Sequence, residues 1–138
     1  MEAQKIRSPE TNTKRGYMYC RPDQIYYNSI IDAWMCNGKV VSEELVEVAR
    51  LVMDLVEKLK LPRDYYYNKF AEQCDVIEYL IDNRRNRPLF IIALGFITAN
   101  TREITLKQVS MKLNIKLRKI LASYKYYVKG LAVTEKLA

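Results

Sequence analysis

The chain has 138 residues, of which 49% are hydrophobic and only four each are Gly and Pro, and it carries a formal net charge of +7. A chain of this length can bury the core of one domain, and so few turn-forming residues favour helices over a sandwich or barrel. The sequence contains no His and only three, widely spaced Cys residues, which together exclude the usual zinc sites and any nucleophile activated by His. We therefore expect no enzymatic activity, no metal, no cofactor and no small-molecule substrate.

The positive charge is concentrated near the C-terminus. Residues 100–138 hold nine Lys or Arg residues and two acidic ones, Glu103 and Glu135, whereas acidic and basic residues balance within 1–99. Basicity confined to one segment favours an acidic partner, either nucleic acid or an acidic protein face.

Residues 1–22 are predicted to form a flexible basic tail, because they are polar and show no periodicity. They contain no apolar signal-peptide segment, so we expect an intracellular protein, cytoplasmic in a prokaryote or an archaeal virus host and nuclear in a eukaryote. Cys20, Cys36 and Cys74 are odd in number and widely spaced. We expect three reduced, partly buried thiols.

Three helices are predicted in the first 82 residues. Asp23 suits the N-cap of a helix over 23–35 that ends at Asn37-Gly38. Ser42 begins a helix over 42–59 whose apolar residues follow the helical period. A third helix is expected over 64–82, after Leu61-Pro62.

The stretch after Pro88 is predicted to be the central helix, over 88–99. The eleven residues from Leu89 to Ala99 carry no charge, and a helix that is apolar all round must be covered by other elements. It is too short to span a membrane, which takes about 20 apolar residues, so we expect no membrane association.

Two further helices complete the predicted all-α fold. Thr105 and Gln108 have the spacing of a capping box, which indicates a helix over 106–113. Asn114 is expected to cap a last helix over 115–129, and residues 132–138 are expected to fray. The residues predicted to face inward on this last helix are Leu117, Ile120, Leu121, Tyr124, Tyr127, Val128 and Leu131.

Four short motifs in order make residues 42–131 resemble a cyclin-type repeat of transcription factor IIB and its archaeal counterpart, transcription factor B. They are Leu59-Lys60-Leu61-Pro62, Arg85-Asn86-Arg87-Pro88, Thr105-Leu106-Lys107-Gln108-Val109 and Ile115-Lys116-Leu117-Arg118-Lys119-Ile120. The chain departs from the family in Asn86, which replaces a Gly, and in Gln108, which replaces a Glu. It has one repeat rather than two and no zinc ribbon.

The resemblance implies a single cyclin-like five-helix domain at 23–131, with the repeat core at 42–131, a central buried helix and an added N-terminal helix. It also implies a role in transcription, with TATA-binding protein or RNA polymerase as a partner. Since the family uses two repeats where this chain has one, two further hypotheses are a homodimer and a truncated regulator that competes with the full factor.

The predicted nucleic-acid site lies on the last two helices, which a short turn joins as in a helix-turn-helix. Its outward residues are Lys107, Lys112, Lys116, Arg118, Lys119 and Ser123. These cations suit phosphate contacts more than sequence readout, although any amphipathic helix also needs a solvated face. A second basic patch, Arg84, Arg85 and Arg87, either binds phosphate or an acidic partner or caps the preceding helix and pairs with Asp82.

The predicted function is a regulator like transcription factor IIB that binds DNA, the basal transcription machinery, or both. The alternative is a cyclin-like adaptor, a kinase regulator or assembly factor, that binds only protein. A free-standing helix-turn-helix repressor is the third hypothesis.

Overall fold

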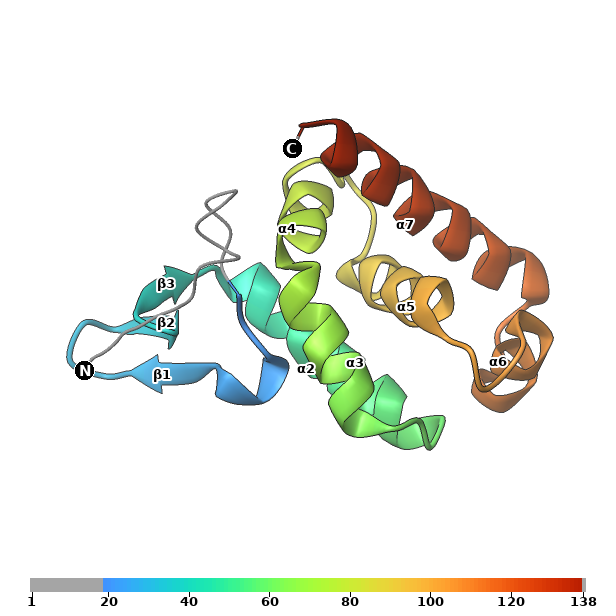
Figure 1. Ribbon diagram of the computed structural model, residues 1–138, viewed down its shortest axis with the longest axis horizontal. Coiled ribbons are helices and arrows are strands. Elements are labelled where there is room, and N and C mark those ends of the chain that lie inside the picture. Colours follow the sequence, from blue (N-terminus) through green and yellow to red (C-terminus); the bar gives the residue numbers. More distant parts are fainter. Residues whose placement is uncertain (1–18, 138) are drawn as a thin grey trace.

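The computed structural model describes residues 19–137, which form a small sheet at one end and six α-helices (Figure 1). The elements are the 3-10 turn η1 (Pro22–Gln24), β1 (Tyr26–Asn28), β2 (Ala33–Cys36), β3 (Lys39–Val41), α2 (Glu43–Lys58), α3 (Arg63–Glu72), α4 (Cys74–Asp82), α5 (Leu89–Asn100), α6 (Leu106–Leu113) and α7 (Leu117–Leu137). Most of the predicted tail at 1–22 lies outside the described residues. Its last part is packed, because Cys20 and Pro22 are buried.

The sheet shows that the all-α prediction was wrong. Residues 23–35, expected to be a helix, form η1, β1 and most of β2, and the sheet is antiparallel in the order β1-β2-β3. Asn37 and Gly38 join β2 to β3 with φ of 51° and 79°. Two consecutive residues with positive φ make the tight turn whose twist matches a hairpin, so Asn37-Gly38 is a strand connection and not the end of a helix.

A disulfide between Cys20 and Cys36 joins the start of the described chain to β2. The prediction of three reduced thiols was therefore wrong for these two residues. Cys74 is the free thiol, is buried, and donates a hydrogen bond to the Cys20 carbonyl at 3.3 Å. Disulfides persist in oxidising compartments and in intracellular proteins of hyperthermophiles.

The segment predicted as one helix over 64–82 is two helices that meet at Gln73. The backbone of Gln73 departs from helical geometry, at φ −110° and ψ 18°, so that α3 ends and α4 begins there. Its side-chain amide exchanges two hydrogen bonds with that of Asn100, at 3.0 and 3.2 Å, and accepts a third from the Tyr127 hydroxyl at 2.7 Å. The break is stabilised because these partners satisfy its polar side chain.

α5 lies at the centre of the helices, as predicted for the apolar stretch after Pro88. Residues Ile92 to Thr98 are all buried, and α5 packs between α2 on one side and α7 on the other (Figure 1). A Cβ added at Gly95 would lie 2.6 Å from the Ser123 carbonyl oxygen and 2.7 Å from the Tyr127 Cβ. Gly95 therefore permits the backbones of α5 and α7 to approach each other closely.

α7 is longer than predicted. It extends to Leu137, so residues 132–137, expected to fray, continue the helix, and Thr134 is buried. A Cβ at Gly130 would lie 2.8 Å from Leu80 Cδ2, which shows that α7 also packs closely against α4. Gly130 is thus an interior packing position of α7.

We predict that Gly95→Ala destabilises the fold by about 2 kcal/mol, because the new methyl group overlaps backbone that cannot move alone. Gly130→Ala is the matched control. Its methyl meets the flexible end of Leu80, and the gain of about 1 kcal/mol in helix propensity offsets the clash. Urea denaturation measures both free energies of unfolding. Equal stability of Gly95→Ala and the wild type would contradict the close approach of α5 and α7.

We predict that iodoacetamide does not modify the native, unreduced protein. Burial raises the pKa of the Cys74 thiol to about 12, and only the thiolate reacts. Unfolding in urea without reductant should expose one reactive thiol, Cys74, whereas urea with reductant should expose all three cysteines of the chain. Intact mass counts the adducts. Three adducts without reductant would rule out the Cys20–Cys36 disulfide.

Candidate nucleic-acid interface

The first helix of the interface, α6, begins at the capping box that the sequence predicts. The Thr105 hydroxyl accepts a hydrogen bond from the Gln108 amide at 3.1 Å, and the Gln108 side chain accepts one from the Thr105 amide at 2.8 Å. Two N–H groups that a helix start leaves unpaired are thereby satisfied. α6 packs through Val109, which is fully buried, and leaves Lys107 and Lys112 exposed.

Residues 114–116 form the turn between α6 and α7. Asn114 has a left-handed conformation, with φ 55°, and is the C-cap of α6, so the prediction that it caps α7 was wrong. The Ile115 amide donates to the Ser110 carbonyl at 3.0 Å, and the Ser110 hydroxyl donates to the Ile115 carbonyl. These two bonds fix the turn and hence the position at which α7 begins.

Three cations lie at the start of α7. Lys116, Arg118 and Lys119 are exposed, and no acidic residue lies in the first turn of this helix. Within residues 19–137 no ion pair involves these three residues, Lys107 or Lys112. The N-terminal end of a helix is positively polarised and disfavours cations. Within the part of the chain that the structure describes, the corner where α6 meets α7 is therefore a site of uncompensated positive charge.

Ser123 does not belong to this surface, and its prediction as a contact residue was wrong. Its side chain is completely buried, because residue 123 faces Gly95 on α5. Its hydroxyl has no hydrogen-bond partner among the described residues. Residues 119 and 123 are four positions apart and so lie on the same side of a helix. Residue 123 is buried and Lys119 is exposed because α5 packs against α7 at residue 123.

The predicted second basic patch is mainly structural. Arg84 donates from Nη1 to the Ile81 carbonyl at 3.1 Å, which caps α4, and Arg87 stacks over the ring of Tyr126 at 4.5 Å. Only Arg85 extends into solvent without a partner among residues 19–137. Tyr126 is ten positions beyond Lys116, or about 15 Å along a helix, so the two basic groups are not brought together.

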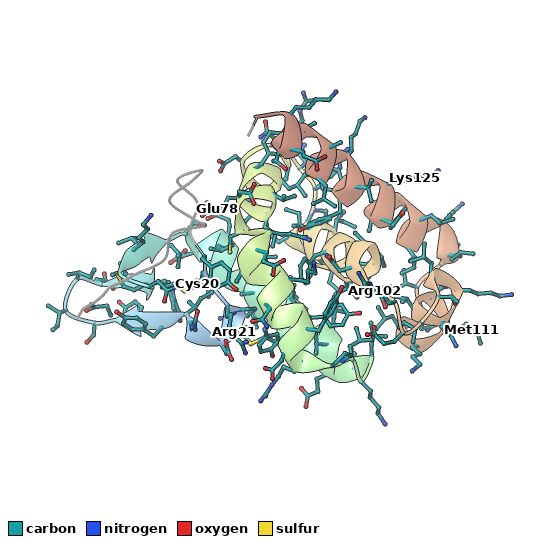
Figure 2. All side chains as sticks on the ribbon, viewed as in Figure 1. Cys20, Arg21, Glu78, Arg102, Met111 and Lys125 are labelled. Carbon is teal, nitrogen blue, oxygen red and sulfur yellow. A yellow bond between two sulfur atoms is a disulfide. The ribbon has the colours of Figure 1, made fainter. Side chains whose placement is uncertain are left out.

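Two further cations, which were not part of the predicted site, lie on the outer side of α7. Lys125 and Lys129 are exposed, and Lys125 projects away from the body of the molecule (Figure 2). With Arg118 they have spacings of seven and four, which bring residues to the same side of a helix. That spacing was visible in the sequence. The two cations extend the positive surface from the corner along α7.

A polar strut connects α3 to the loop before α6. The buried Tyr66 hydroxyl donates to Glu103 Oε1 at 2.7 Å. Burial raises the pKa of Tyr66 above its ordinary value, so the hydroxyl stays protonated, and the hydrogen bond from Tyr66 lowers the pKa of Glu103. In the same loop, the Arg102 guanidinium lies 5.8 Å from the Tyr65 ring. The strut holds the entry to α6 in place.

The described part of the chain contains no group of three acidic or cysteine side chains arranged to hold a metal ion. None of its helices combines the length and the hydropathy required to cross a membrane. Comparison of the chain with models of protein families, with curated proteins and with solved structures found no match.

We predict that Tyr66→Phe raises the pKa of Glu103 toward its ordinary value of 4.5. A lowered folded-state pKa stabilises the protein above the unfolded-state pKa, and this contribution is lost as pH falls through the folded value. The variant should therefore lose less stability than the wild type on acidification through this window. An NMR titration of Glu103 and urea denaturation at several pH values test this, and an unchanged Glu103 pKa would disprove the strut. Tyr65→Phe is the control.

Proposed function

We propose that the protein binds double-stranded DNA through the corner where α6 meets α7. The observation that supports this is the uncompensated charge of Lys107, Lys112, Lys116, Arg118 and Lys119, all of them exposed and none in an ion pair within the described chain. Three of the five lie at the positively polarised end of α7, where cations reduce helix stability. A bound polyanion removes this cost.

The helix arrangement suits a duplex. Two helices joined by a short turn, with cations on the first turn of the second helix, resemble the way in which a helix-turn-helix approaches the major groove. The surface is rich in Lys, which contacts phosphates as a point charge. Asn and Gln, which recognise a base edge through bidentate hydrogen bonds, do not dominate this surface. We propose binding that depends more on phosphate than on sequence.

A role in transcription, with TATA-binding protein or RNA polymerase as partner, is supported only by the resemblance of the motifs in 42–131 to the transcription factor IIB repeat. The alternative function, an adaptor that binds protein, is favoured by a separate observation. Leu117, Leu121 and Val128, predicted to face the core, are 36–39% exposed on α7.

We predict that Lys116→Glu/Lys119→Glu weakens binding to a duplex by at least about tenfold at low salt, because each reversal removes a phosphate contact and adds repulsion. For the wild type, the logarithm of the affinity should fall linearly with the logarithm of the salt concentration, with a slope of about −4.5 for five contacts. Fluorescence anisotropy of a labelled duplex measures both quantities.

The control is Lys39→Glu/Arg50→Glu, which makes the same change in net charge at exposed positions on β3 and α2. It should retain affinity within about twofold, since remote charges are screened beyond about 10 Å. Thermal melts of both variants establish that each remains folded. Equal loss of affinity in the two variants would mean that net charge alone, and not the α6–α7 corner, attracts DNA.

A further inference from the structure

A row of aliphatic and aromatic side chains lies exposed along one side of α7. Leu117, Leu121 and Val128 are 39%, 36% and 37% exposed, and Tyr124, between them, is half-buried. Their spacings of four, three and four residues place them on one side of a helix, over a length of about 17 Å. We call these four residues the α7 apolar row.

The row is bordered by cations along its whole length. Arg118, Lys125 and Lys129 each follow a member of the row by one position and are exposed. None of the three forms an ion pair among residues 19–137, and the segment 104–134 contains no acidic residue. The outer surface of α7 is therefore amphipathic, with an apolar row beside a positive one.

An apolar row beside a row of cations determines which kind of partner fits this surface. A second copy of the chain would place these cations against their own counterparts, which is unfavourable. DNA phosphates would match the cations but leave the aliphatic side chains without apolar contact. A helix with apolar residues at the same spacing and Asp or Glu beside them matches both rows at once.

We propose that the α7 apolar row is the docking site for an acidic amphipathic helix of another protein. The partner helix packs along α7, its apolar residues cover Leu117, Leu121 and Val128, and its carboxylates pair with Lys125 and Lys129. The inference does not rest on DNA binding, because none of the four residues of the α7 apolar row is among the five cations that we propose to contact DNA.

The test uses the full chain and a fluorescein-labelled designed peptide of about 18 residues, long enough to cover the row. The peptide has Leu at spacings of four, three and four, Glu beside them, and Ala elsewhere. Anisotropy should show saturable binding that Leu121→Ser/Val128→Ser weakens by at least about tenfold, through lost apolar burial. Lys125→Glu/Lys129→Glu should weaken it by a similar factor.

The matched control is Ile30→Ser/Val40→Ser. Ile30, in the turn between β1 and β2, and Val40, on β3, are 92% and 61% exposed, at the other end of the molecule from α6 (Figure 1). This variant should bind the peptide like the wild type. A second control peptide has the same composition with its Leu residues scattered over all sides of the helix. It should bind at least about tenfold more weakly, because it presents no apolar row.

Three results with the peptides would overturn the proposal. They are no peptide binding, even where the protein binds anionic phospholipid vesicles, equal binding of the scattered peptide, and an unchanged affinity for Leu121→Ser/Val128→Ser. Duplex affinity provides the last comparison. It should stay within about twofold in Leu121→Ser/Val128→Ser, and a parallel loss of DNA and peptide binding would make the row part of the DNA surface instead.

Discussion

The close approach of α5 and α7 at Gly95 is the constraint on which the helical part of the molecule depends. No side chain separates the two backbones there, and the Ser123 carbonyl and the Tyr127 Cβ occupy the space that a larger residue would need. At Gly130, α7 packs instead on the flexible side chain of Leu80 of α4. Because Gly95 brings α7 against α5, it determines which side of α7 is buried and which faces solvent.

A polar network then fixes how the helices end. Gln73, at the junction of α3 and α4, contacts Asn100 at the end of α5 and Tyr127 on α7. Buried polar groups that are fully paired favour one arrangement, whereas a half-paired network destabilises the fold. The loop that follows Asn100 is held by Tyr66 through Glu103. The position of the basic corner is thus set by neutral and acidic residues that do not belong to it.

The sequence predicted the elements whose signals are local. Ser42, Pro88 and the Thr105–Gln108 capping box mark where α2, α5 and α6 begin, and each acts within one helical turn. The sheet was missed because Asn37-Gly38 suits either the end of a helix or a hairpin turn. The β-forming residues Trp34, Val40 and Val41 on either side favour the hairpin. The break at Gln73 carries no local signal, since its cause is an amide 27 residues away.

The site was predictable where charge alone decides the outcome. Lysine and arginine side chains on α6 and α7 face solvent because burying an unpaired cation is costly, and five of the six predicted contact residues are exposed. Ser123 and the α7 apolar row could not be assigned in the same way, since either side of an amphipathic helix accepts Ser, Leu or Val.

The burial of these residues depends on which neighbours cover α7. In the described chain, α5 and α4 cover only part of α7, so some apolar residues of α7 remain partly exposed. Apolar side chains that this fold leaves partly exposed, beside cations that form no ion pair among residues 19–137, are the ones that we propose a partner covers.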